Sequence, residues 1–546
     1  MSKESPDVGS TNQSVIHVRC SARIIIFAGA VGWFLTIVGL HRRNWQDAWI
    51  LDGVLLPTIA FIAVSFWVVA SERDLRIVAL ICAVFVATVS LVPGLKYVQP
   101  YGVAIDSSVH FLTVQEMLVT GTIAERHTYA SIAGMHGWLA TIGLLGELAP
   151  DQLMQFVLPL MGALIPLLTY WICRRAAMPE ALTKRIVIVS CLGGFPWFLA
   201  NGTGFSLALL LLAFGATLIQ AFYSSTRALR VAHMMLAITS ILLLIIWHST
   251  TPLMLSFAMI LASFSPTVID MVQRRKLRLS PSLSIAGMGI LSMAGFLLYH
   301  WLLADRVWQV MVATTVRMIQ ADEALVEIVP SRLFEISLMD QMRVAAVIHG
   351  RDGILLLLAA IGIVVVWHQR KVWRHQLPLY VFVFLEMYAY ALMIVAAFSG
   401  AGYQRVIWAP LTLAPFFAGP ALWWIETRLP GLIGERRLLR FAWAPVAGLL
   451  VGAWLVQIFA CQPLIPRVGA TAAYPSGDYI VWLHETNTAY QQRMFTFAQE
   501  RAESDATFAI DVVGQREFLR YFGVEASESR RLYTPLKRRE SINPDK

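Results

Sequence analysis

The sequence is poor in charged residues, and this deficit limits the class of protein. Only 14% of the 546 residues are charged, whereas 57% are hydrophobic. A soluble domain carries about 25% charged residues, so the balance indicates an integral membrane protein with room for one small soluble domain. The net charge is +9, but the basic residues lie in short clusters between apolar runs. That pattern follows membrane topology and does not predict a nucleic-acid partner.

Cysteine is also scarce, and several functional motifs are missing. The five cysteines have no metal-type spacing, and their odd number argues against a disulfide framework. The sequence lacks a Gly-rich nucleotide loop, a metalloprotease helix and a nucleophile elbow, which argues against a pump driven by a nucleoside triphosphate. It also has no internal repeat of the kind that marks the duplicated halves of many transporters. The cysteines are Cys20, Cys82, Cys173, Cys191 and Cys461.

Long apolar runs are what the chain does contain. A helix that crosses a bilayer needs roughly 20 apolar residues, and helices satisfy their own backbone groups in lipid. We therefore expect an all-α polytopic membrane protein with about 13 transmembrane helices. The first run follows a polar leader. No small-residue cleavage site follows the run, so the run is interpreted as a retained span and not as a cleaved signal peptide. The predicted spans are 22–40, 50–70, 76–94, 152–173, 185–201, 205–223, 231–247, 252–271, 282–303, 352–368, 377–398, 406–425 and 441–460.

The basic clusters predict the orientation. If the runs alternate, the clusters all fall on one side, which the positive-inside rule makes cytoplasmic. Arg42 and Arg43, in the first outer loop, are the exception. The N-terminus is then cytoplasmic and the C-terminus extracytoplasmic, in a multi-pass protein of the plasma (cytoplasmic) membrane. The clusters are Arg73 and Arg76; Arg174, Arg175, Lys184 and Arg185; Arg227 and Arg230; Arg274, Arg275, Lys276 and Arg278; Arg370, Lys371 and Arg374; and Arg428, Arg436, Arg437 and Arg440.

Three predicted extracytoplasmic segments are too polar to cross the membrane. In the first, Asp106 to Thr120 predicts a helix, and His136 to Leu148 predicts a short helix lying on the membrane. In the tail, Tyr479 to Leu483 and Thr507 to Val513 predict strands, and Gln515 to Tyr521 predicts a helix. The expected organisation is a cytoplasmic leader (1–21), three transmembrane helices (22–94), a first large outer loop (95–151), transmembrane helices 4–9 (152–303), a second outer loop that includes helices (304–351), transmembrane helices 10–13 (352–460) and an outer C-terminal tail (461–546).

Asp106 is the first candidate for chemistry. It stands in a polar, turn-rich stretch, close after Pro100 and Gly102. A carboxylate there can act as a general base or a metal ligand. An Asp before a helical stretch also caps the helix by accepting backbone N–H bonds. The two roles are compatible.

His248 lies in the very short outer loop between two predicted spans. Such a compact polar loop can face a cavity and bind polar groups. In the alternative interpretation the loop is a plain connector, with Thr251 as the helix cap and Pro252 opening the next helix. That alternative gives His248 no role.

Two further residues carry charge at unusual places. Arg405 is a strong positive charge next to the span 406–425, where a guanidinium suits bidentate binding of phosphate or simply reaches to the interface from a helix end. Glu386 lies deep within the span 377–398. An intramembrane acid is a functional candidate because it is costly to bury, although a bond to a neighbouring Tyr or Trp would make it structural.

The order of these features resembles the GT-C superfamily of polyprenyl-phosphate-dependent membrane glycosyltransferases, in a poorly characterised prokaryotic branch. The resemblance covers roughly residues 97–425. It departs from the family pattern in having Asp-Ser-Ser at 106–108 in place of a two-acid motif, and two additional spans before this loop. The features are the acid Asp106 in a large first outer loop, a short apolar helix from Met135 through His136 to Gly146, the span Phe156 to Arg175, the loop Asn201 to Gly204, the His248 loop and Arg405.

The resemblance implies a function and a set of roles. Asp106 would be the base that deprotonates the acceptor hydroxyl, Arg405 would hold the donor phosphate, and His136, His248 and Glu386 would contact substrate. The partners would be the lipid bilayer, a polyprenyl-phosphate sugar donor and a glycan, lipid or protein acceptor. No cofactor is certain; a divalent cation, Mg²⁺ or Mn²⁺, stays open, although the lack of a second acid beside Asp106 argues against it.

Two other functions are compatible with the sequence. A transporter or flippase of a lipid-linked or amphiphilic substrate would use Glu386 as its intramembrane coupling residue. A scaffold subunit of an envelope-assembly complex would depend on no single polar residue. The large, asymmetric outer segments and the lack of repeats favour the glycosyltransferase.

Overall fold

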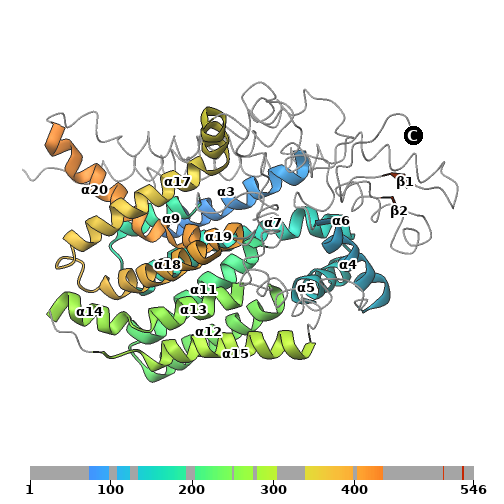
Figure 1. Ribbon diagram of the computed structural model, residues 1–546, viewed down its shortest axis with the longest axis horizontal. Coiled ribbons are helices and arrows are strands. Elements are labelled where there is room, and N and C mark those ends of the chain that lie inside the picture. The colour runs from blue at the N-terminus through green and yellow to red at the C-terminus, as the bar shows by residue number, and fades with distance from the viewer. Residues whose placement is uncertain are drawn as a thin grey trace, which may run out of the picture.

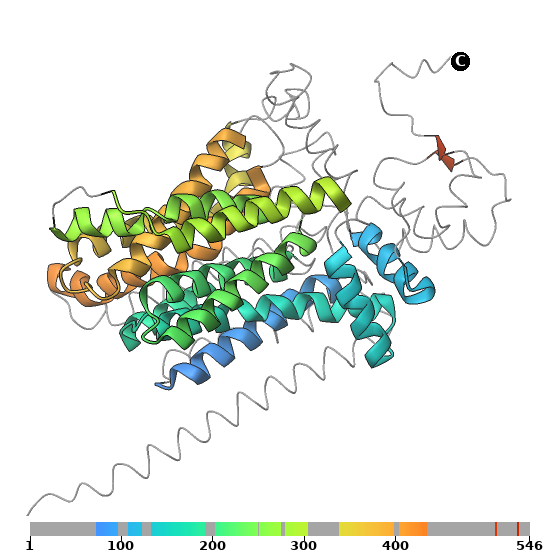
Figure 2. The ribbon, with the colours of Figure 1, turned by 90° about the horizontal axis from the view of Figure 1, so that it is seen from below.

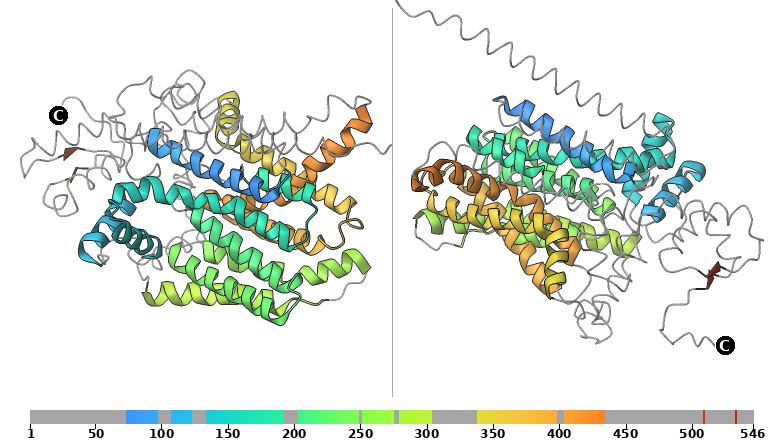
Figure 3. Two further views of the ribbon diagram at one scale, coloured as in Figure 1. Left: turned by 180° about the vertical axis from the view of Figure 1, so that it is seen from behind. Right: turned by 90° about the horizontal axis from the view of Figure 1, so that it is seen from above.

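The chain forms a bundle of helices (Figure 1). This computed structural model describes residues 73–96, 107–122, 133–191, 203–248, 251–274, 279–303, 338–397, 403–433, 508–509 and 532–533. The predicted spans 22–40, 50–70 and 441–460 lie outside these residues. Most helices share one general direction, and α4 and α5 lie at one end of the bundle, as the views from below and behind also show (Figures 2 and 3).

The helices in chain order are α3 (Leu75–Lys96), α4 (Ser107–Thr120), α5 (Ala133–Gly146), α6 (Pro150–Gln152), α7 (Leu158–Leu160), α8 (Leu164–Arg175), α9 (Glu180–Ser190), α11 (Thr203–Phe222), α12 (Arg227–Trp247), α13 (Thr251–Ala262), α14 (Ser265–Arg274), α15 (Leu283–Leu303), α17 (Leu338–His368), α18 (Leu377–Ala397), α19 (Tyr403–Leu413) and α20 (Pro415–Ile433). Two short parallel strands follow, β1 (Phe508–Ala509) and β2 (Leu532–Tyr533). β1 falls within the predicted strand Thr507 to Val513, whereas the other elements predicted in the tail lie outside the described residues.

Within the described residues, five helical stretches are long and apolar enough to cross a membrane, or six if one bent pair counts as a single span. They are Gly204–Phe222, Arg227–Trp247, Thr251–Gln273, Leu283–Leu302 and Leu377–Ile394, with the bent pair Val406–Leu413 and Pro415–Arg428. The protein is therefore a helical membrane protein, and the number of about 13 spans is not confirmed. These stretches match the predicted spans to within a few residues. An apolar run of this length determines both that the segment is helical and that it crosses the membrane.

Proline breaks two of the predicted spans. The span 152–173 is a helical run interrupted by a π-helix at Leu153–Val157 and a 3₁₀ turn at Met161–Ala163. Pro166, soon after that turn, has no N–H to continue the α-helical ladder. The span 406–425 bends by 41° between α19 and α20. Pro410 lies inside α19 and Pro415 begins α20, so two ladder donors are missing around the bend.

Helix α11 forms the centre of the bundle. In its membrane window 78% of the residues are buried, against 33% for α12 and for α15. α12 and α15 expose large apolar side chains such as Leu243, Ile290 and Trp301. Helices that are apolar all round are expected in lipid, where an exposed apolar face needs no protein partner. α12 and α15 therefore lie at the lipid boundary, with α11 behind them.

Three basic connections meet at one end of the bundle, which we call the basic end. The Tyr223 hydroxyl donates to the carbonyl of His375 at 3.2 Å and accepts from the backbone N–H of Leu379 at 3.3 Å. Nε2 of Gln376 donates to the carbonyl of Ala177 at 2.9 Å. Burial raises the pKa of the Tyr223 phenol, so it keeps the proton that it donates. These bonds join connections that carry Arg174 and Arg175; Arg227 and Arg230; and Arg370, Lys371 and Arg374, as the alternation of the spans predicts.

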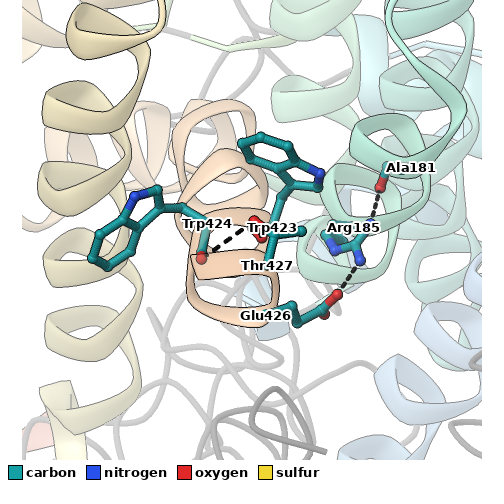
Figure 4. Close-up of polar contacts among 6 residues, drawn as sticks. All are labelled: Ala181, Arg185, Trp423, Trp424, Glu426 and Thr427. Carbon is teal, nitrogen blue, oxygen red and sulfur yellow. Dashed lines mark hydrogen bonds and ion pairs between the residues drawn. The ribbon is translucent and has the colours of Figure 1, made fainter. Parts of the chain in front are cut away.

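An ion pair links helices α9 and α20. The guanidinium of Arg185 bonds the carboxylate of Glu426 (Figure 4). Thr427, beside that acid, donates its hydroxyl to the carbonyl of Trp423 at 2.8 Å. Both side chains of the pair are partly buried, at 21% and 16% exposure. Arg185, predicted only as part of a cytoplasmic cluster, thus also joins two helices that are far apart in sequence.

Candidate functional site

Three histidines from separate segments lie near one another, and we call them the histidine cluster. His110 is on the first turn of α4, His136 is on α5, and His248 directly follows α12. Nδ1 of His110 is 2.9 Å from Nε2 of His136, so one ring donates a hydrogen bond to the other. The ring centroids are 5.1 Å apart. His248 is close enough for its charge to act on His110. α12 begins at the basic end, so the cluster lies at the opposite end, the histidine end.

A glycine brings the helices of the cluster together. A Cβ atom added at Gly134 would lie 2.8 Å from the carbonyl oxygen of Ile246. The first turn of α5 therefore touches the last turn of α12, and only hydrogen fits between them. His136 follows two residues after this contact and is buried, at 1% exposure. The contact places His136 beside the end of α12, where His248 begins the loop.

His248 has a structural role that the sequence did not reveal. Its Nδ1 accepts the backbone N–H of Thr251 at 3.2 Å and lies 2.8 Å from the Thr251 hydroxyl. α13 begins at Thr251, so the imidazole satisfies the first backbone N–H of this helix and acts as a cap for it. With Nδ1 accepting, a neutral His248 carries its proton on Nε2.

His110 is neutral at physiological pH. Burial, and to a smaller degree the nearby His248, lowers the pKa of His110 to about 4. A neutral ring has one N–H donor and one acceptor nitrogen. The hydrogen bond to His136 uses Nδ1 of His110, so Nε2 of this ring holds the lone pair when Nδ1 donates and the proton when Nδ1 accepts. A pair of this kind can relay a proton between two groups.

The histidine cluster should make stability depend on pH. Between pH 6.5 and 4 the unfolded chain takes up a proton at His110 (ordinary pKa about 6.5) and the folded chain does not. The free energy of unfolding should therefore fall by up to about 3 kcal/mol as pH drops through this window, and level off below pH 4. Thermal unfolding in detergent at pH 7, 5.5 and 4.5 measures the fall. It should be reduced in His110→Asn, and an unchanged slope would contradict the assignment.

Three aromatic rings pack together beside the cluster: Trp247 and Trp138 are one and two residues from His248 and His136, and Phe205 contacts both of them. The rings of Trp247 and Phe205 are 4.3 Å apart, Trp138 and Trp247 are 5.8 Å apart, and Trp138 and Phe205 stack at 6.0 Å, all between centroids. They come from α12, α11 and α5. Trp and Tyr gather where a membrane protein meets the membrane–water interface, and Trp247 directly precedes His248. The histidine end is therefore placed at an interface and not at the centre of the bilayer.

The other predicted site residues have different outcomes. Asp106 lies outside the described residues, but α4 begins at Ser107, directly after it, so the predicted helix is confirmed. Arg405 is on the first turn of α19, and its side chain lies outside the description. Glu386 is buried in α18, eleven residues before the end of that helix at Ala397. The structure thus brings together His136 and His248, and the convergence of Asp106 and Arg405 on them stays a prediction.

His110 was missed in the sequence, although its spacing could have revealed it. It follows Asp106 by four residues, which is the separation of neighbours on one face of a helix. In the sequence it looks like an isolated polar residue among Val109, Phe111 and Leu112. Its role depends on the packing of α5 against α4. No local pattern in the sequence predicts that contact between the two helices.

The described part of the cluster does not fit a divalent cation. Among the residues that the structure describes, no group of three or more His, Cys, Asp or Glu side chains could hold a metal ion. Nδ1 of His248 is engaged by Thr251, and Nδ1 of His110 by His136. Mg²⁺ and Mn²⁺ also prefer oxygen ligands, which the three imidazoles do not supply. No step of the proposed chemistry is therefore assigned to a metal.

Comparison with known proteins gives a loose structural likeness. No family model matches the chain, and no curated protein matches it. The chain is similar to the apo structure of the Archaeoglobus fulgidus oligosaccharyltransferase, with a TM-score of 0.42 and 12% identity, over 84% of this chain and 65% of that one. It is also similar to the same enzyme with zinc and sulfate, with a TM-score of 0.37 and 13% identity, over 73% of this chain and 53% of that one. The chain thus spans less than two thirds of the length of either structure. A likeness of this size places the chain in no family, and the functional argument rests on the residues.

Proposed function

We propose that the protein is a membrane glycosyltransferase that moves a sugar from a polyprenyl-phosphate donor to an acceptor hydroxyl on the extracytoplasmic side. The observation that carries the proposal is the histidine cluster, a set of interacting imidazole rings at one end of an apolar bundle. In the sequence, His110 of the cluster follows Asp106 by four residues. The cluster is also at the end away from the basic connections, which the positive-inside rule places in the cytoplasm.

The chemistry assigns a role to each group. The acceptor oxygen attacks the anomeric carbon, the bond from that carbon to the phosphate oxygen breaks, and the electron pair leaves with the phosphate. Asp106 takes the acceptor proton as general base. His110 is one helical turn further along the chain and bonds His136, so the pair can carry that proton away. Arg405, on the first turn of α19, binds the departing phosphate as a bidentate cation.

An apolar bundle suits a lipid-linked donor. A polyprenyl chain stays in the membrane while its phosphate lies at the interface, so the enzyme needs an interfacial polar site beside lipid-facing helices. α12 ends at the cluster and exposes Leu242 and Leu243 along its outer face. The aromatic rings of Trp138, Phe205 and Trp247 border the same end and offer flat apolar surfaces at the depth of the interface.

The alternative function is transport of a lipid-linked or amphiphilic substrate, and Glu386 is the observation that favours it. This acid is completely buried within a membrane-spanning helix, the usual place of a coupling residue. The two functions predict opposite results. In a transporter, Glu386→Gln stops transport and Asp106→Asn is tolerated, whereas in the glycosyltransferase Asp106→Asn stops transfer.

Two substitutions of His248 separate capping from chemistry. In His248→Asn the amide oxygen can still accept the N–H of Thr251, so the cap of α13 is kept, whereas His248→Ala removes it at a cost of about 1 kcal/mol. We expect both variants to lose transfer at least about 10-fold, and only the alanine variant to unfold at a lower temperature.

The measurement is release of polyprenyl phosphate from a panel of polyprenyl-phosphate sugars by the purified protein in lipid nanodiscs, together with thermal unfolding of each variant. If His248→Asn transfers sugar as well as the unmodified protein, the imidazole serves only as a cap and has no part in the site.

A further inference from the structure

Helix α18 has two distinct faces, and its one acid is on the inner face. Phe384, Tyr388 and Leu392 recur at every fourth residue and are 41% to 50% exposed. Residues on the opposite side, including Phe382, Glu386 and Tyr390, are completely buried. The exposed stripe is apolar or aromatic, as a surface facing lipid should be. Glu386 therefore points into the protein, which is where intramembrane acids are placed when they have a function.

Glu386 interacts with the hydroxyl of Tyr390, one turn further along the same face. Both carboxyl oxygens and that hydroxyl are buried, and within the described residues none of the three atoms is in a hydrogen bond of good geometry. An ionised carboxylate in such a place would lose its hydration with little in return, a cost of many kcal/mol. An uncharged carboxylic acid avoids most of that cost and keeps an O–H donor.

Counting residues along α18 and α19 puts the acid near the depth of the break between α19 and α20. α18 ends at Ala397 and α19 begins at Tyr403, and the two helices pack against each other. Glu386 is eleven residues before the end of α18 and Ala414 is eleven residues after the start of α19, which is about 16 Å along each helix. Pro415 has no N–H for the carbonyl of Leu411 four residues earlier. The 41° bend thus leaves a backbone acceptor near the depth of the acid.

The helices packed against α18 bring no charge to this depth. α11 and α13 contain no charged residue. Arg405 is at the first turn of α19, and Asp270 and Arg274 are toward the far end of α14. Glu426 and Arg428 lie beyond the midpoint of α20, and Glu426 is paired with Arg185. No cation on these elements is therefore placed to hold Glu386 in its ionised form.

We propose that Glu386, with Tyr390 and the α19–α20 break, forms an intramembrane proton-binding site. Its ligand is the proton itself, which Glu386 retains at pH values where an acid in water is ionised. The site does not depend on sugar transfer. It is also a point of covalent modification, because a membrane-soluble carbodiimide reacts with a protonated acid. The acid O–H adds across one C=N bond and its proton moves to nitrogen, so no atom is lost.

The test is infrared spectroscopy of the purified protein in nanodiscs at about pH 8.5. The carbonyl band of a protonated carboxylic acid should be present in the unmodified protein and absent in Glu386→Gln. Glu426→Gln is the matched control, since it removes an acid that is ion-paired and should leave the band unchanged. Tyr390→Phe should shift the band, because it removes the hydroxyl one turn away.

A second measurement uses dicyclohexylcarbodiimide and peptide mass spectrometry. Modification of Glu386 should continue at pH 8.5, whereas acids that are ionised in water should no longer react. Absence of the infrared difference band at pH 8.5 would overturn the proposal whether or not the carbodiimide reaches the site. A band that remains in Glu386→Gln would overturn it as well.

Discussion

Replacing Asp106 with Asn should lower sugar transfer by about 10²- to 10⁴-fold, which is the usual contribution of a general base. The amide has almost the same shape as the carboxylate but cannot take the acceptor proton. The loss should appear in kcat with little change in KM, because proton transfer occurs in the transition state and not in binding. The assay is release of polyprenyl phosphate by the purified protein in nanodiscs.

Asparagine is also an excellent helix cap, and this makes the substitution a clean one. α4 begins at Ser107, so a residue at 106 that caps this helix would do so equally well as Asn. Asp106→Ala is the companion variant, because it removes both capping and proton transfer. If Asp106→Asn keeps full activity while Asp106→Ala unfolds more easily, the residue is a cap only and the base lies elsewhere.

The sequence predicted the helices well where a single apolar run decides the outcome. α12, α15 and α18 begin or end within a few residues of their predicted spans, because length and hydropathy suffice there. α17 begins at Leu338, fourteen residues before its predicted span, since polar residues can extend a helix beyond the lipid. The bend between α19 and α20 was missed although Pro410 and Pro415 stand in the sequence. Hydropathy continues across the prolines, and only the backbone reveals the break.

The site was predicted in part. His136 and His248 were both expected at the outer end, and the structure places them near one another through His110. The assembly depends on the contact of Gly134 with Ile246, which joins residues more than a hundred positions apart and follows from no local period. The capping role of His248 was equally hidden, because an imidazole is an unusual cap. Local chemistry thus identified two of the residues, and tertiary packing decided what they do.

Gly362→Ala should be among the most damaging substitutions in the bundle. A Cβ atom added at Gly362, on α17, would overlap the backbone carbonyl of Phe417, on α20. Backbone atoms cannot turn aside as side chains do, so the two helices must separate. Close helix packing at small residues is a main source of stability in membranes, and overpacking that moves the backbone costs about 1–3 kcal/mol and in some cases more. Thermal unfolding in detergent should show the loss.

Gly353→Ala, nine residues earlier on the same helix, is the matched control. A Cβ atom added there meets nothing within 4 Å, and alanine favours a helix over glycine by up to about 1 kcal/mol. This variant should therefore be as stable as the unmodified protein or slightly more so. The two substitutions change the chain identically, and only the neighbour differs. If both variants unfold at the same temperature, α17 and α20 do not pack as closely at Gly362 as the structure shows. Another contact would then have to hold α20 between α17 and α9.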